Sequence, residues 1–176
     1  MDVKSYLKSA TQEELLELEG WLSHELKSRT SKPLKIHRVK TYSDGASRGN
    51  PGHAGIGALL YDENSNKIVQ DYRYIGIGTN NEAEYRALLL ALDHASDVTK
   101  GHVDCYMDSE LLVKQLNGEY AIKSEKLVKF YLEVKHRIRK FQTVRFAHHP
   151  RTHPMLRLAD KLANKAIDEA KPTSSS

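Results

Sequence analysis

Residues 42–52 read Tyr-Ser-Asp-Gly-Ala-Ser-Arg-Gly-Asn-Pro-Gly. Just before and into this stretch, residues 39–43 alternate between apolar and polar side chains, which predicts a β-strand. The strand is expected to end at Asp44, and the glycine-rich turn that follows allows the backbone to approach a ligand closely. The stretch therefore predicts a carboxylate at the end of a strand, open to a binding partner.

Three further acidic residues have comparable positions. Glu84 opens a predicted helix, Asp108 ends a second predicted strand, and Asp160 lies near the start of the last predicted helix. Asp44 and Asp108 each follow a tyrosine by two residues, and the period of two in a strand places each Tyr–Asp pair on one face. Four convergent carboxylates predict a site for hard metal ions and phosphodiester chemistry.

Each acid also has a simpler explanation when it is taken alone. An aspartate before a glycine-rich turn usually belongs to the turn, and an aspartate before a helix is usually its N-cap. An acid near a helix start often only complements the helix dipole. Glu84 differs because it heads a stripe of apolar residues on its helix, and a buried glutamate is rarely unpaired. Glu82 lies off that stripe and is expected to face solvent.

Composition and charge limit the class of protein. The chain has 176 residues, of which 39% are hydrophobic and 28% charged, and this predicts one globular core with a small appendage. No apolar run is long enough to span a membrane, and no secretory signal is expected. The single cysteine, Cys105, cannot form an internal disulfide. Together these features predict a cytoplasmic location. Residues 1–35 carry six basic and six acidic residues, whereas residues 123–145 carry eight basic and two acidic ones, so the excess of positive charge is local.

The chain is expected to divide into a helical N-terminal appendage with a linker (1–34), an α/β domain (35–170) and a disordered tail (171–176). In the appendage, Thr11 and Glu14 form a predicted capping box that precedes apolar residues at helical spacing. These apolar residues are Leu15, Leu18, Trp21, Leu22 and Leu26. Such a helix needs a partner surface, which can be its own α/β domain, a second copy of the chain or another protein.

The elements predicted beyond residue 38 describe a mixed sheet with helices. Strands are predicted at 38–44, 53–62, 67–78, 102–107 and 143–147, and helices at 81–95, 109–117, 124–141 and 155–170. Short connections between the first three strands favour antiparallel hairpins. The alternation of helix and strand that follows gives an α/β class with a mixed sheet.

Four motifs together closely resemble type 1 ribonuclease H, and they span about residues 38–170 in the expected order. They are the stretch at 42–52, Thr-Asn-Asn-Glu-Ala-Glu at 79–84, Met-Asp-Ser at 107–109 and Ala-Asp-x-Leu-Ala-Asn at 159–164. The resemblance implies a ribonuclease H-like fold, whose five-stranded sheet has the order 3-2-1-4-5 with its first three strands antiparallel. It also implies an endonuclease that hydrolyses the RNA strand of RNA–DNA hybrids and leaves 3′-hydroxyl and 5′-phosphate ends.

The resemblance further implies that four carboxylates bind two divalent ions: Asp44, Glu84, Asp108 and Asp160. Oxygen ligands of this kind suit Mg²⁺ or Mn²⁺ and not zinc. Two such ions about 4 Å apart can activate a water and stabilise the leaving 3′ oxygen.

Contacts to the minor groove of the hybrid are implied for four more residues: Ser47, Asn50, Asn80 and Asn81. An asparagine amide can both donate to and accept from a 2′-hydroxyl, which distinguishes RNA from DNA. The alternative is that these asparagines only serve a turn and a helix cap.

Two features depart from the pattern of the family. The basic protrusion that the family often carries is missing after residue 116, as in shorter prokaryotic variants, and the basic 124–141 helix either replaces its phosphate contacts or is a solvated face. The catalytic histidine of the mobile loop has three candidates, His148, His149 and His153. His153 is favoured as a proton shuttle near neutral pH, although it precedes Asp160 by fewer residues than is usual in the family.

Two other functions share these sequence features. A non-catalytic nucleic-acid-binding protein of the same fold is the main alternative, and the presence of all four acids argues against it. A nuclease domain separated from a reverse transcriptase would share the chemistry but not the appended helix.

Overall fold

The structure of the protein, a computed structural model, describes residues 9–30 and 36–170. The chain divides into two compact units, residues 1–34 and 35–176. The first unit contains helix α2 (Gln12–Thr30). The predicted capping box at its start is confirmed: the Glu14 N–H donates to Thr11 Oγ1 over 3.3 Å, and the Thr11 N–H donates to the Glu14 carboxylate over 2.7 Å. The predicted tail, residues 171–176, lies outside the described residues.

Helix α2 exposes large apolar side chains. Trp21 and Leu16 are each 62% exposed, and Leu15 and Leu22 are exposed as well. The side chain of Leu26, the last member of the predicted apolar stripe, is outside the described part of the helix.

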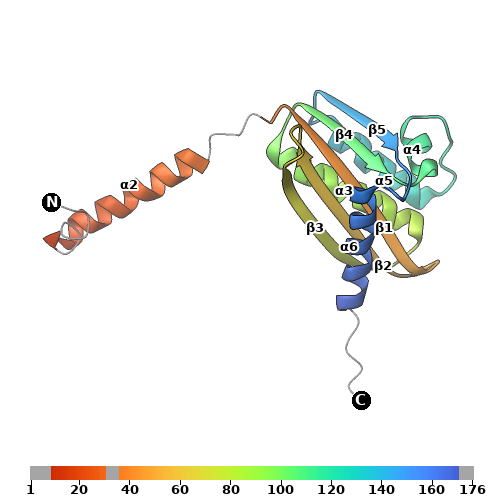
Figure 1. Cartoon of the computed structure of the whole chain (residues 1–176), viewed down its shortest axis with the longest axis horizontal. Coiled ribbons are helices and arrows are strands. Elements are labelled where there is room, and N and C mark those ends of the chain that lie inside the picture. The colour runs from red at the N-terminus through yellow and green to blue at the C-terminus, as the bar shows by residue number, and fades with distance from the viewer. Residues whose placement is uncertain (1–8, 31–35, 171–176) are drawn as a thin grey trace, which may run out of the picture. The chain divides into compact units, whose positions relative to one another are not determined.

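The second unit is built on a five-stranded sheet with the order β3-β2-β1-β4-β5 (Figure 1). The strands are β1 (Arg38–Gly49), β2 (Gly52–Asp62), β3 (Lys67–Gly78), β4 (His102–Met107) and β5 (Thr143–His148). β2 pairs antiparallel with β1 and β3, whereas β4 pairs parallel with β1 and β5. This confirms the strand order and the strand directions that the resemblance implies.

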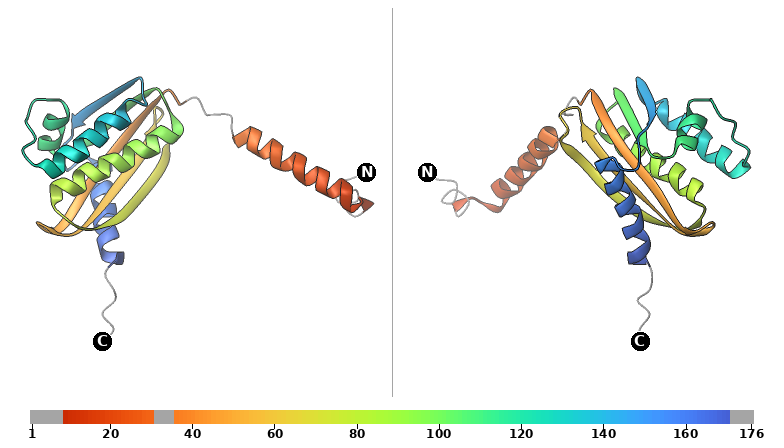
Figure 2. Two further views of the ribbon diagram at one scale, coloured as in Figure 1. Left: turned by 180° about the vertical axis from the view of Figure 1, so that it is seen from behind. Right: turned by 45° about the vertical axis from the view of Figure 1, so that its right-hand side comes forward.

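Helices cover both faces of the sheet (Figures 1 and 2). α6 (Pro154–Ala170) packs on one face against β1, β2 and β3, and α3 (Asn80–Val98) packs on the other against β1 and β2. α5 (Glu125–Ile138) packs on α3, and the short α4 (Glu110–Leu116) lies against β4 and β5. Within the described residues, no helix is both long and apolar enough to cross a membrane.

Two glycines let helices on opposite faces come close to the β1–β2 hairpin at the level of Asp44. A Cβ atom at Gly45 would lie 2.2 Å from the carbonyl carbon of Ala83 in α3. A Cβ atom at Gly57, which pairs with Asp44 across the β1–β2 hairpin, would lie 2.3 Å from the carbonyl oxygen of Ala159 in α6. Two of the predicted acids come directly after these contacts: Glu84 follows Ala83 in α3, and Asp160 follows Ala159 in α6.

The predicted end of the first strand at Asp44 is wrong. β1 continues to Gly49 because residues 44–49 stay paired with β2 in a long hairpin. The parallel pairing of β1 with β4 stops earlier, and its last pair is Tyr42 with Tyr106. Asp44 and Asp108 therefore both lie just beyond the point where the two parallel strands part.

Candidate active site

Asp44 is a buried carboxylate without a countercharge of its own. Its side chain belongs to β1, the residue is 4% exposed, and its Oδ2 atom has no hydrogen-bond partner among residues 9–30 and 36–170. Burial, followed by the nearby charges of Asp108 and Asp160, raises the pKa of Asp44 to about 8, and Arg151 opposes this rise. A buried acid in this setting is costly to ionise unless a cation joins it.

Asp108 follows β4 and is not the N-cap of the next helix. Ser109 caps α4 instead, since its Oγ accepts a hydrogen bond from the Leu112 N–H over 3.2 Å. The carboxylate of Asp108 remains available to the site, where its Oδ2 lies 3.5 Å from Nε of Arg151. The capping explanation for this acid is therefore wrong.

Asp160 projects from α6 toward the same arginine. Nη2 of Arg151 donates to Oδ1 of Asp160 over 2.9 Å. Nδ2 of Asn164, one turn further along the helix, lies 3.2 Å from the same oxygen. These two donors fix the direction of the carboxylate.

Glu84 reaches the site from the N-terminal part of α3. Nδ2 of Asn80 donates to Glu84 Oε1 over 2.8 Å. Burial raises the pKa of Glu84 and the charge of Asp108 adds to the rise, whereas the Ser109 side chain, Arg151 and Asn80 oppose it. The carboxylate of Glu84 is thus influenced by the start of α4 as well as by its own helix.

The four predicted carboxylates converge from four parts of the chain: β1, α3, the residue after β4, and α6. Asp44 interacts electrostatically with the other three. As they stand, no three acidic, histidine or cysteine side chains in residues 9–30 and 36–170 are arranged to hold a metal ion. The guanidinium of Arg151 instead supplies positive charge to Asp108 and Asp160. An unpartnered buried oxygen and a set of carboxylate ligands fit the requirements of a hard divalent cation.

Arg151 is the site residue that the sequence analysis misses. It lies in the loop between β5 and α6, which also carries His149 and His153, and its side chain is 70% exposed. The sequence carries one electrostatic indication of its role. Four clustered acids without a metal ion need another cation, and Arg151 lies nine residues before Asp160.

The candidate histidines make other contacts. His153 stacks on Tyr42, with ring centroids 5.3 Å apart, and its Nδ1 accepts a hydrogen bond from the Met155 N–H over 3.3 Å. His149 packs edge-on against Tyr106, and His148 is exposed at the end of β5. Among the residues that the structure describes, none of the three makes a hydrogen bond to the four carboxylates.

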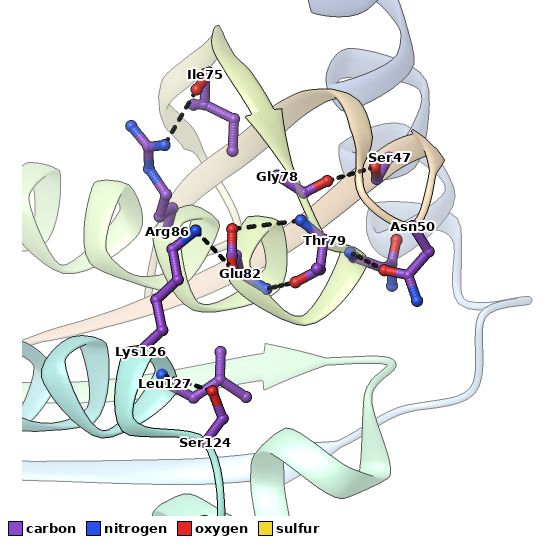
Figure 3. A network of polar contacts seen from close by, with 11 residues as sticks. Ser47, Asn50, Ile75, Gly78, Thr79, Glu82, Arg86, Ser124, Lys126 and Leu127 are labelled. Carbon is purple, nitrogen blue, oxygen red and sulfur yellow. Dashed lines mark hydrogen bonds and ion pairs between the residues drawn. The ribbon is translucent and has the colours of Figure 1, made fainter.

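A polar network holds the N-terminus of α3 (Figure 3). Thr79 and Glu82 form a capping box, in which each side chain accepts from the backbone N–H of the other over 3.3 Å. Glu82 also forms an ion pair with Lys126 of α5 at 2.8 Å. The prediction that Glu82 faces solvent is wrong, because its side chain turns back to cap the helix and the residue is only 8% exposed.

The predicted substrate contacts lie beside this network. The Ser47 hydroxyl is 2.8 Å from the carbonyl oxygen of Gly78, and Asn50 Oδ1 accepts from the Asn80 N–H over 3.3 Å (Figure 3). Asn50, Asn80 and Asn81 are exposed. The end of the β1–β2 hairpin and the first turn of α3 thus present these residues on one surface.

The basic helix α5 is partly committed to ion pairs within the protein. Lys126 pairs with Glu82, and Arg137 pairs with Asp93 and Glu133. Other basic residues of this region are exposed: Lys123, Lys129, Lys135, Arg139 and Lys140.

The strand order, the helices on both faces and the carboxylates at the β1–β4 junction define the ribonuclease H-like class of folds. Residues 42–166 match the family described as reverse transcriptase-like. The chain is also 37% identical over 134 residues to a bifunctional protein of Mycobacterium tuberculosis, and the match covers 76% of this chain and 36% of that relative. The chain therefore spans about a third of the length of this curated relative.

Two crystal structures of type 1 enzymes are similar over nearly their whole length. RNase H1 of the archaeon Halobacterium salinarum is 36% identical with a TM-score of 0.72, and 76% of this chain matches 99% of it. LC11-RNase H1, isolated from compost and solved in complex with an RNA/DNA hybrid, is 37% identical with a TM-score of 0.69, and 75% of this chain matches 98% of it. The chain belongs to the reverse transcriptase-like, ribonuclease H-like family, and its resemblance to type 1 ribonuclease H is confirmed.

Proposed function

We propose that the protein is a metal-dependent ribonuclease H, an endonuclease that hydrolyses the RNA strand of RNA–DNA hybrids and leaves 3′-hydroxyl and 5′-phosphate ends. The convergence of the other three acids on Asp44, with its unpartnered buried oxygen, carries this proposal. The similarity to an RNase H1 whose structure contains an RNA/DNA hybrid supports the choice of substrate.

Asp44, Glu84, Asp108 and Asp160 are the proposed ligands of two Mg²⁺ or Mn²⁺ ions. When bound, such ions supply an activated water and stabilise the leaving 3′ oxygen. The protein contributes the direction of each carboxylate: Asn80 orients Glu84, and Asn164 orients Asp160. The raised pKa of Asp44 means that this carboxyl keeps its proton near neutral pH unless a cation joins it.

Arg151 is the proposed contact to the reacting phosphate group. Its guanidinium reaches Asp108 and Asp160 while the side chain remains 70% exposed, so an anionic substrate has access to it. A planar guanidinium can hold two phosphate oxygens at once, which suits this task better than an imidazole ring.

Selection of the hybrid is assigned to the surface formed by the β1–β2 hairpin and the start of α3. We infer that Ser47, Asn50, Asn80 and Asn81 meet the minor groove there, where exposed amides recognise 2′-hydroxyls. The exposed basic residues of α5 and its flanks, such as Lys129, Lys135 and Arg139, are the proposed contacts to the backbone phosphates. Phosphate contacts position the duplex, and the asparagines tell its two strands apart.

Residues 1–34 are proposed to be an appendage that is separate from catalysis, followed by the ribonuclease H domain at 35–170. The exposed apolar residues of α2 favour contact with a protein, either another copy or a foreign partner. A cytoplasmic location stays a prediction from the composition.

Digestion of matched duplexes tests the proposed activity. One sequence is prepared as an RNA–DNA hybrid, an RNA duplex and a DNA duplex, and each is incubated with Mg²⁺, with Mn²⁺ or with excess chelator. We expect cleavage only of the RNA strand of the hybrid, and only with metal. Tight hybrid binding without any cleavage would favour the non-catalytic alternative, and cleavage in excess chelator would contradict the metal-dependent chemistry.

A further inference from the structure

The loop that brings Arg151 to the acids needs an anchor. Its ion pairs to Asp108 and Asp160 are made by a side chain that is 70% exposed, and solvent-exposed pairs hold a loop only weakly. The backbone is fixed at both ends, where the His149 N–H donates to the Met107 carbonyl oxygen over 2.9 Å and the Arg157 N–H donates to that of His153 over 3.0 Å. Between these points the His153 N–H donates to the Pro150 carbonyl oxygen over 2.8 Å and closes a turn around Arg151, but this bond is internal to the loop and does not tie the turn to the sheet.

A cluster of four rings connects the loop to the sheet. Tyr42 and Tyr106, which are register partners on β1 and β4, stack with centroids 5.1 Å apart. The His153 ring lies nearly parallel to Tyr42, at 5.3 Å and 15°, and the His149 ring meets Tyr106 edge-on at 4.6 Å. The two imidazoles are 5.0 Å from each other. The histidines thus flank Arg151 on both sides and rest on the tyrosines that precede Asp44 and Asp108.

The ring nitrogens are consistent with packing in place of proton transfer. The Nδ1 atom of His153 accepts a hydrogen bond from the Met155 N–H, which occupies this nitrogen within the loop. Burial, and then the neighbouring His153 and His148, lower the pKa of His149 and so favour its neutral form. A neutral His149 ring can pack against Tyr106 and His153 without charge repulsion.

We propose that His149 and His153 are positioning residues, whose rings pack on Tyr106 and Tyr42 and hold Arg151 at Asp108 and Asp160. The expected loss of cleavage rate rests on the proposed ribonuclease H function, whereas the anchoring of the loop does not. In this proposal the two histidines act through ring packing, and Arg151 makes the contacts with Asp108 and Asp160.

Paired substitutions separate an aromatic role from proton transfer. His153→Phe keeps a ring and removes both nitrogens, whereas His153→Asn keeps a hydrogen-bond acceptor for the Met155 N–H and removes the ring. For an anchor, we expect the Phe variant to cleave hybrid within about threefold of the wild-type kcat and the Asn variant to lose roughly 10- to 100-fold, as a misplaced site residue does. Equal large losses in both variants would overturn the proposal, because a proton shuttle predicts them.

Coupling to Arg151 gives a second kinetic comparison. If His153 acts through the arginine, then adding His153→Asn to Arg151→Ala should cause little further loss, because the two changes remove one contact. A double variant whose losses multiply would show that His153 acts independently of Arg151 and would overturn the proposal.

Amide hydrogen exchange tests the anchor without any substrate. Exchange across residues 149–156 should accelerate in His149→Asn and His153→Asn and stay near the wild-type rate in His149→Phe and His153→Phe. Unchanged exchange in both Asn variants would overturn the anchoring role. If the wild-type protein cleaves no duplex, the proposed function fails, and the exchange measurement still decides whether the histidines anchor the loop.

Discussion

Asp44→Asn should stabilise the metal-free protein while it removes the central acid of the site. An unfolded aspartate ionises near its ordinary pKa of 3.8, whereas folded Asp44 keeps its proton until about pH 8. Between these values the folded state binds more protons than the unfolded state, so the free energy of unfolding of the wild type falls as pH rises. Asparagine does not titrate, so the free energy of unfolding of Asp44→Asn does not fall in this way as pH rises.

The size of the effect follows from the same two values. The difference between 3.8 and about 8, at about 1.4 kcal/mol per pH unit, gives a ceiling of about 6 kcal/mol above pH 8. The asparagine amide would itself be buried where Oδ2 of Asp44 has no partner among the described residues, which costs about 1–3 kcal/mol, so we expect a net gain of about 2–4 kcal/mol. At pH 5 only about a third of the difference should remain, because unfolded aspartate has ionised but the loss has accumulated over only about one pH unit above 3.8.

Denaturant unfolding in chelator at pH 5 and pH 8 measures the effect. Asp104→Asn is a matched control, because Asp104 is buried on β4 but paired with Arg38 at 2.8 Å, and it should lose stability instead. Added Mg²⁺ or Mn²⁺ should stabilise the wild type more than Asp44→Asn, since binding to the folded state adds to its stability. An Asp44→Asn protein no more stable than the wild type at pH 8, with the same pH dependence, would refute the reasoning.

Three further changes have defined outcomes. Arg151→Ala should lower hybrid cleavage by about 10- to 100-fold, and Arg151→Lys should recover part of the loss, as steady-state kinetics would show. Gly45→Ala should cost about 3 kcal/mol in thermal unfolding, because its Cβ would lie 2.2 Å from the Ala83 backbone. Gly20→Ala is the control: beyond the neighbouring backbone of its own helix, its Cβ would meet no described atom within 4 Å, and the unfolding of the second unit should be unchanged. A chain beginning at residue 35 should still fold and cleave hybrid. Its hybrid affinity should keep the same salt dependence, because residues 1–34 carry balanced charge. A much shallower salt dependence would show that the appendage binds nucleic acid.

The sheet could be predicted from sequence because its local signals are sharp. β3 and β4 have the predicted bounds, 67–78 and 102–107, and both are set off by turn residues and a change of period. β1 was expected to stop at Asp44, where the local pattern ends. Its extension to Gly49 depends on pairing with β2, which is a property of the assembled sheet and not of the segment itself.

The acids of the site were also visible in the sequence, because strand ends and helix starts place side chains by simple geometry. The surroundings of those acids were not. The helical phase of Glu82 predicts that it faces solvent. In the structure its side chain turns back to cap α3 and forms an ion pair with Lys126 of α5. Arg151 reaches the site from a loop whose two histidines contact rings from β1 and β4. Contacts of this kind join distant segments and leave no periodic trace in the sequence.

The hybrid-cleavage rate of Asp44→Asn, compared with those of the wild type and Asp104→Asn in the same buffer with Mg²⁺ or Mn²⁺, tests the central claim most directly. We expect Asp104→Asn to stay within about threefold of the wild type and Asp44→Asn to lose on the order of 10³-fold, because the ions that Asp44 helps to hold supply several kcal/mol to the transition state. Full activity in folded Asp44→Asn would contradict the assignment of this carboxylate cluster as the catalytic site.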